Sequence, residues 1–121
     1  MNLPWWFPFG SVDGIAPRDL YEKLKSNGKD LQLLDVRSQA EYAQGHIANT
    51  INIPINELPS RIGELKFDPA RPVYAICLSG HRSIPAYRFL KSKGYSQVYE
   101  LAGGMMAWWA AKLPNGKRKP G

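Results

Sequence analysis

Apolar residues in this chain gather in short continuous runs rather than in strictly alternating patterns. Such runs occupy residues 31–36 and 72–77, and a briefer one at 50–54 is stopped by Pro54; residues 97–101, "QVYEL", read as a further strand. A continuous apolar run is typical of a strand buried on both faces, as in a parallel sheet. The pattern therefore predicts four strands.

Helical spacing marks the segments between these runs. Leu20 and Leu24 recur one turn apart in residues 17–27, and Gly28 supplies an end to that helix. Ser38 and Glu41 have the spacing of a capping box, which predicts a short helix over residues 38–44. Three later helical segments are predicted: residues 54–65, with Ile55, Leu58, Ile62 and Leu65 facing inward; residues 81–94, with Ile84, Tyr87 or Arg88, and Leu90 to Lys91 in register; and residues 103–113.

Strands that alternate with short helices predict an α/β fold of three layers, a parallel sheet with helices on both faces. The chain has 121 residues, enough for one domain that buries about two-thirds of its unfolded surface. We expect three parts: an aromatic N-terminal extension (1–10), the domain (11–114) and a basic C-terminal tail (115–121).

The N-terminal extension is apolar but lacks the features of a targeting or membrane-spanning segment. It has no basic flank, is interrupted by Pro4 and Pro8, and is far too short to span a bilayer. We expect its aromatic side chains to fold onto the domain or onto a partner subunit. An interfacial membrane contact is the alternative. The side chains concerned are Trp5, Trp6, Phe7 and Phe9.

The charge and the cysteine content bear on partners and on location. The formal net charge is +6, but four basic residues fall in the last ten positions and leave the rest of the chain at about +2. The basic tail is therefore expected to be a solubilising end, and the protein is not expected to bind nucleic acid. A single cysteine cannot form an intramolecular disulfide, which favours a reducing compartment such as the cytoplasm.

That single cysteine, Cys77, is the strongest candidate for chemistry. It stands at the end of a predicted strand and just before a predicted helix, in "YAICLSGHRS". Ligands of open α/β sheets bind at this edge, and the amides and dipole of a helix N-terminus, together with Arg82, favour an anion. Gly80 lets the backbone approach closely. The hypothesis is a pre-ionised thiolate that needs no base, and the alternative is a small buried hydrophobe.

Three separated motifs resemble the single-domain rhodaneses, a family of sulfurtransferases. They are "LLDVRSQAEYAQGHIANTINIP", "CLSGHRS" and "YELAGGMMAWWAAKLP", and the similarity runs from about Ser11 to Pro114. The resemblance implies a five-stranded parallel sheet flanked by helices. It also implies a cofactor-free transfer of sulfur from thiosulfate or a similar donor to cyanide or a thiol, with a protein as a further kind of acceptor.

The resemblance gives each loop residue an expected role. Cys77 would be the nucleophile and the carrier of a persulfide, and Arg82 would close the loop and attract the anion. The residues expected to bind the substrate are Leu78, Ser79, Gly80, His81, Arg82 and Ser83.

The length of this loop separates two related chemistries. Four residues lie between Cys77 and Arg82, as in the sulfurtransferases. Phosphatase and arsenate reductase relatives of the fold have one residue more, which makes a wider cradle for a tetrahedral oxyanion. Sulfur transfer is thus favoured. A cysteine-dependent phosphatase or arsenate reductase and a non-catalytic sulfur-relay or binding module are the alternatives.

Other polar residues of the motifs have mainly structural interpretations. Asp35 and Arg37 end a strand at the same sheet edge, where a structural salt bridge is favoured over a role in shaping the site. His46 is expected to be structural, and the two histidines and the cysteine lack the spacing of metal ligands. Four side chains are expected to form core and pocket wall: Met105, Met106, Trp108 and Trp109.

Overall fold

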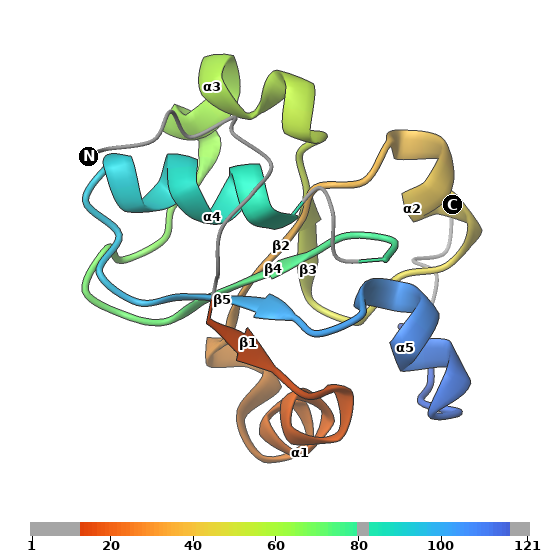
Figure 1. Ribbon diagram of the computed structural model, residues 1–121. Coiled ribbons are helices and arrows are strands. Elements are labelled where there is room, and N and C mark those ends of the chain that lie inside the picture. The colour runs from red at the N-terminus through yellow and green to blue at the C-terminus, as the bar shows by residue number, and fades with distance from the viewer. Residues whose placement is uncertain (1–12, 80–82, 117–121) are drawn as a thin grey trace.

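The computed structural model describes residues 13–79 and 83–116 and consists of one parallel sheet between two layers of helices (Figure 1). The five strands lie in the order β1-β5-β4-β2-β3, and every neighbouring pair is parallel. The predicted fold class is thus confirmed. The strands are β1 (Gly14–Ile15), β2 (Gln32–Asp35), β3 (Thr50–Asn52), β4 (Val73–Ile76) and β5 (Val98–Leu101).

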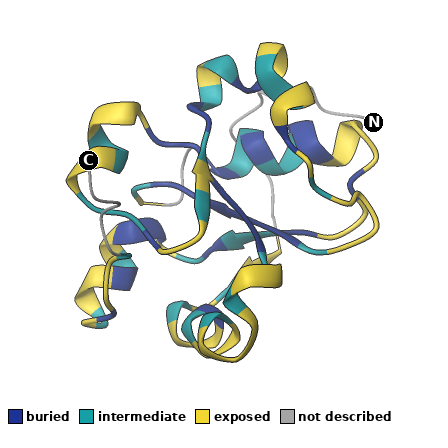
Figure 2. Cartoon of the chain, turned by 180° about the vertical axis from the view of Figure 1, so that it is seen from behind, coloured by how far each residue is buried: buried dark blue, intermediate teal, exposed yellow. Residues whose placement is uncertain are grey.

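The helices divide between the two faces of the sheet. Leu20 of α1 packs in one apolar cluster with Met105 and Trp108 of α5, whereas Leu58 of α3 shares another with Phe89 of α4. The central strands β2 and β4 are buried along their whole length, and the outward faces of the helices are exposed (Figure 2). The helices are α1 (Pro17–Asn27), α2 (Gln39–Gln44), α3 (Leu58–Arg61), α4 (Ser83–Ser92) and α5 (Gly104–Ala110), with 3-10 turns at Gly28–Asp30, Ile55–Glu57 and Ile62–Glu64.

Strand β1 is the element that the apolar pattern did not locate. It has only two residues, too few for a periodic signal. Its position comes from pairing with β5: the amide of Glu100 donates to the carbonyl of Asp13, and the amide of Ala102 donates to that of Ile15. Tertiary pairing, rather than local sequence, makes this segment a strand.

The capping box predicted at α2 is present. Ser38 accepts from the amide of Glu41, and the Glu41 side chain accepts from the amide of Ser38. Each interaction satisfies an amide that the helix itself leaves without a partner. The helix ends before Gly45, as the sequence indicates.

The buried face of α4 differs in part from the predicted one. Leu90 is fully buried as expected, but Ile84 and Tyr87 are only half-buried, and the helix packs instead through Ala86 and Phe89. The apolar pattern favours large side chains over alanine. A helix that lies close to a sheet, however, can turn a small residue inward.

Helix α5 also corrects a prediction. Met105 and Trp108 belong to the core, but Met106 is 58% exposed and Trp109 is 38% exposed. Only one side of α5 faces the sheet, and the two outward residues lie one turn apart on the other side. Of the expected core and pocket-wall residues, Met106 and Trp109 are therefore not part of the core.

Within the part of the chain that the structure describes, no helix has the length and apolarity needed to cross a membrane.

The N-terminus of α5 is fixed against the backbone that follows β4. The amide of Met105 donates to the carbonyl of Cys77 over 2.8 Å, and that of Met106 to the carbonyl of Leu78 over 2.9 Å. Gly104 makes this approach feasible, because a Cβ there would lie 2.5 Å from the Cys77 carbonyl oxygen, and because its φ is +63°. The paired glycines in "AGGMM" thus bring a helix against a strand end.

We predict that Gly104→Ala destabilises the fold. The new methyl group would collide with backbone atoms that cannot rotate away, and the residue would also adopt a left-handed conformation. Together these effects should lower the free energy of unfolding by roughly 2–4 kcal/mol. Urea denaturation followed by tryptophan fluorescence measures the change.

Gly63→Ala is the matched control, since nothing lies within 4 Å of a Cβ at Gly63. Its stability should stay within about 0.5 kcal/mol of the unsubstituted protein. Equal effects of the two substitutions would contradict the proposed close approach.

Candidate active site

The sheet topology places a switch point at the ends of two central strands. The chain leaves β2 towards β3, on one side, and leaves β4 towards β5, on the other. Neighbouring parallel strands whose connections part in this way form the ligand-binding switch point of open α/β sheets. Cys77 follows β4 directly, and Asp35 ends β2. Both predicted positions thus lie at this switch point.

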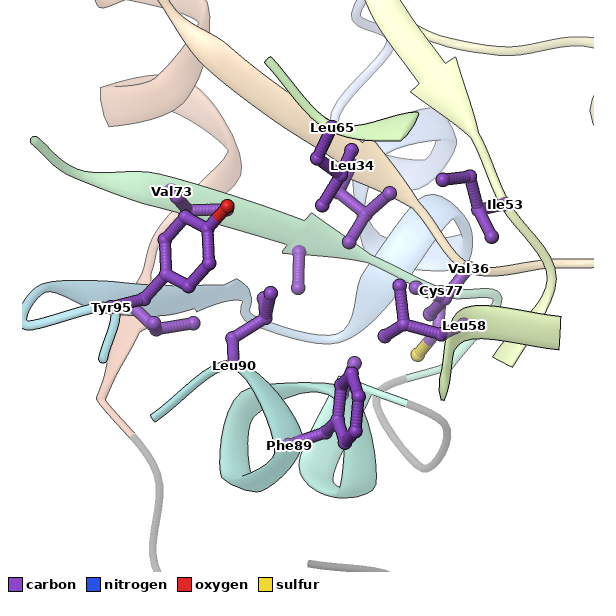
Figure 3. Packing of buried hydrophobic residues seen from close by; sticks show 13 residues of the cluster. Leu34, Val36, Ile53, Leu58, Leu65, Val73, Cys77, Phe89, Leu90 and Tyr95 are labelled. Carbon is purple, nitrogen blue, oxygen red and sulfur yellow. The ribbon is translucent and has the colours of Figure 1, made fainter. Parts of the chain in front are cut away.

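The thiol of Cys77 lies at the rim of an apolar cluster rather than in open solvent. The residue is 1% exposed, and Figure 3 shows it at one end of the cluster, near Val36 and Leu58. The strand end that carries it is held on both sides. The amide of Val36 donates to the carbonyl of Ile76 over 2.9 Å, and Met105 binds the carbonyl of Cys77 itself. The position of Cys77 is therefore set by backbone contacts.

The side chains nearest to the sulfur form a short polar chain. The Cys77 thiol donates to Oγ of Ser83 over 3.7 Å, and the Ser83 hydroxyl donates to Oε2 of Glu100 over 2.5 Å. Ser83 is fully buried at the start of α4, and Glu100 is half-buried on β5. The three residues come from three different elements and meet beside the apolar cluster. A carboxylate is thus connected to the cysteine through one hydroxyl group.

Asp35 and Arg37 form a buried ion pair at the end of β2. Their exposed fractions are 0% and 1%, and the Nη2–Oδ2 distance is 2.8 Å. The guanidinium also donates to the carbonyl groups of Glu41 and Gly45 at the end of α2, and the Asp35 carboxylate accepts from the amide of Arg37. The indole of Trp109 lies against the guanidinium, 5.9 Å from its carbon to the ring centroid. The pair therefore joins β2 to the end of α2.

The predicted substrate-binding loop is described only at its ends. Leu78 is half-buried and Ser79 is exposed, and Ser83 contacts the sulfur of Cys77 as stated above. The remaining predicted residues, Gly80, His81 and Arg82, lie outside the described residues, so the expected amide cradle stays a prediction.

His46 lies away from the sulfur, against α2. Its ring stacks on Tyr42, with centroids 3.8 Å apart, and its Nδ1 lies 2.8 Å from the Tyr42 carbonyl oxygen. The carbonyl of His46 accepts from the amide of Gly116. Among the described residues, no three histidine, cysteine, aspartate or glutamate side chains are grouped so that they could hold a metal ion.

Glu100 is the residue of this site that the sequence interpretation missed. A signal was present in "QVYEL", where a carboxylate stands between apolar residues of a strand. In a strand, side chains two positions apart share a face, so Glu100 lies on the side of Val98, which packs against α4. A charged residue facing a buried layer needs a polar partner.

Comparison with known proteins shows the family of this chain. The sequence model of the family "Rhodanese-like domain" matches residues 16–111. A sulfurtransferase of Allochromatium vinosum is 37% identical over 103 residues, which cover 85% of this chain and 94% of that protein. The thiosulfate sulfurtransferase GlpE of Shewanella oneidensis is 33% identical over 86 residues, 71% of this chain and 83% of that protein.

A solved structure gives the same result at the level of the fold. The rhodanese-related protein of Thermoplasma volcanium superposes with a TM-score of 0.74 at 35% identity, and the match covers 86% of this chain and 97% of that one. The residues matched by the family model, 16–111, include all of the sheet except β1, and they include Cys77, Ser83 and Glu100. This chain therefore belongs to the rhodanese-like domain family, which includes relatives named as sulfurtransferases.

Proposed function

We propose that this protein transfers a sulfane sulfur from thiosulfate, or a similar small anion, to cyanide or a thiol through a persulfide on Cys77. The observation that carries the proposal is the position of the only cysteine in the chain, at the switch point of a rhodanese-like sheet. A relative of similar size is named as a thiosulfate sulfurtransferase, which supports thiosulfate as the donor. No cofactor enters the proposed reaction.

In the first half-reaction the thiolate of Cys77 attacks the outer sulfur of thiosulfate. A new S–S bond forms, the S–S bond of thiosulfate breaks, and sulfite leaves with the electron pair. The burial of Cys77 favours a slender donor that presents one terminal sulfur atom. In this proposal the amides of residues 78–82 hold the developing negative charge, with Arg82 opposite the anion.

In the second half-reaction a thiophilic acceptor attacks the outer sulfur of the persulfide. The persulfide S–S bond breaks, thiocyanate or a new persulfide leaves, and Cys77 regains its thiolate. We propose Ser79 and His81 as residues at the mouth of the loop that tune the choice of acceptor. A protein thiol remains an alternative acceptor to a small molecule.

Two alternatives are less well supported. A cysteine-dependent phosphatase or arsenate reductase would need a wider loop than the four residues between Cys77 and Arg82, and the names of the relatives do not favour it. Hydrolysis of an aryl phosphate by the purified protein would revive it. A purely binding module would leave the cysteine without a use, whereas a sulfur-relay module would still carry sulfur on Cys77.

For Asp35 and Arg37 we propose a structural role in place of a direct one. Both ends of the ion pair are occupied: the carboxylate by Arg37 itself, and the guanidinium by Asp35 and by two carbonyl groups of α2. Neither side chain retains an exposed surface for a substrate. The pair instead holds the end of β2 against the end of α2.

The proposed reaction predicts a covalent adduct. Incubation of the purified protein with thiosulfate, followed by removal of the donor, should leave a species heavier by one sulfur atom in intact-mass spectrometry. Cyanide should then remove the added mass and release thiocyanate. Other sulfane donors should be tried in parallel.

Cys77→Ala is the control for this adduct, because it removes the only thiol of the chain. The variant should show neither the added mass nor turnover. A native protein that acquires no sulfur from any donor would rule out the catalytic proposal.

A structural role for the ion pair predicts a loss of stability without a loss of chemistry. Arg37→Met leaves the buried carboxylate of Asp35 without its partner, which should cost about 3–5 kcal/mol. Molecules that remain folded should still acquire sulfur at the unsubstituted rate. Urea denaturation and single-turnover sulfur transfer measure the two quantities.

Arg61→Met is the matched control, since Arg61 pairs with Glu57 and Glu64 at the surface. The hydrogen bond from Arg61 holds the pKa of Glu64 below its usual range. Solvent screens both surface pairs. The midpoint of unfolding should move far less than in Arg37→Met. Sulfur transfer that fails in folded Arg37→Met would instead assign Arg37 to the substrate.

A further inference from the structure

We propose that Ser83 and Glu100 form a proton relay that ionises Cys77, with Glu100 acting through Ser83 as the final proton acceptor. The inference rests on the proposed function in so far as Cys77 is the nucleophile. It replaces the expectation, drawn from the sequence, that the cysteine has no basic partner.

The hydrogen bonds from Cys77 to Ser83 and from Ser83 to Glu100 run in one direction. Ser83 has one hydroxyl proton, and that proton points to Oε2 of Glu100 over 2.5 Å. Its oxygen therefore presents a lone pair to Cys77, and the thiol donates to it over 3.7 Å. The three groups are aligned for two proton shifts in the same direction. With its proton committed to Glu100, Ser83 cannot donate to a thiolate until these shifts have occurred.

Glu100 lies between two small residues of the neighbouring strands. It pairs with Gly14 on one side and with Ala75 on the other. Neither neighbour carries a large side chain on the face where α4 lies, so the carboxylate has room to reach Ser83 at the beginning of that helix. Small neighbours thus leave space for one long acidic side chain.

The titratable groups around Glu100 come from several elements of the fold. From β1 the adjacent carboxylate is that of Asp13, whose carbonyl accepts from the amide of Glu100 and whose side chain accepts from the Tyr87 hydroxyl of α4. Burial, and then the bond to Asp13, raises the pKa of Tyr87 above its ordinary value, so Tyr87 stays neutral. Cys77, which follows β4, is linked to Glu100 through the Ser83 hydroxyl. Among the described residues no salt bridge involves Glu100, whose carboxylate binds Ser83.

The proton transfer is balanced within the site. The S–H bond of Cys77 breaks as an O–H bond forms on Ser83, and the original O–H bond of Ser83 breaks as one forms on Glu100. The products are a thiolate, a neutral serine that now donates to it, and a carboxylic acid. One negative charge has moved from the carboxylate to the sulfur, and no proton has left the protein. The reverse shift restores the thiol after sulfur has been delivered.

The relay has a distinctive signature in the pH dependence of thiol reactivity. A thiol with no internal base loses reactivity about tenfold for each pH unit below its titration. In a coupled pair, the state that holds one shared proton contains a fixed fraction of thiolate, so reactivity levels off at a shoulder in the acid limb. The shoulder should end only when the pair of Cys77 and Glu100 takes up a second proton, so that both groups are protonated.

The test is the rate of Cys77 alkylation by iodoacetamide from about pH 5.5 to about pH 9.5. The unsubstituted protein should show the shoulder. Glu100→Gln, which keeps an acceptor for Ser83 but takes up no proton, should lose it and react about tenfold or more slowly at the acid end. Ser83→Ala should lose it too, because the link is broken while the carboxylate remains.

Tyr87→Phe is the matched control, because it removes the bond to Asp13 on the same helix and leaves the relay intact. It should keep the shoulder. Urea-unfolded protein gives the profile of a free thiol, so a variant that fails to fold is recognised, and the other relay variant then decides. A shoulder that survives in Glu100→Gln overturns the relay. Faster alkylation of that variant at every pH would also overturn it, because Glu100 would then act only as a nearby negative charge.

The two proposals fail in different ways. If thiosulfate gives the one-sulfur adduct but Glu100→Gln keeps the unsubstituted profile, the relay is wrong and the sulfur-transfer proposal stands. If the profile changes as expected but no donor gives an adduct, the relay stands and the proposed reaction is wrong.

Discussion

The parallel arrangement of all five strands is the constraint on which the rest of this structure depends. Because parallel strands end at the same edge, residues from distant parts of the sequence come together there without a dedicated loop. β4 brings Cys77 to this edge, β2 brings Asp35, and β5 leads to the glycines that open α5. The hydrogen bonds from α5 to the carbonyl groups after β4 then fix the start of the loop that follows Cys77. The topology thus determines which residues can cooperate, and local contacts determine their distances.

Burying polar groups at this edge is costly unless each has a partner. No buried nitrogen or oxygen of the described side chains lacks a hydrogen bond. Two different solutions are used. Asp35 and Arg37 neutralise each other and spend their remaining hydrogen bonds on backbone groups, which suits a fixed support. Ser83 and Glu100 form an open chain that leads to a reactive atom. The first arrangement resists change in charge, whereas the second permits it.

The sequence predicted the fold class, four of the strands and the capping box, since each rests on a local pattern. β1 escaped because two residues carry no period, and its strand conformation comes from β5. The inward face of α4 was only partly predicted, because close packing selects Ala86. At the site, Cys77 stood out by its place after a strand, whereas Glu100 did not. Its role depends on a contact between residues 17 positions apart, and no local pattern encodes that contact.

A thiolate beside a carboxylate looks unfavourable at first, because two negative charges would face each other in a poorly solvated place. The Ser83 hydroxyl removes this difficulty, since it lets the pair share one proton and carry one charge in total. The relay has to remove a proton from Cys77 only before sulfur is taken up, while the residue is a thiol. The persulfide, once formed, is a weaker base than the original thiolate and leaves the proton on Glu100 until the sulfur has been passed on.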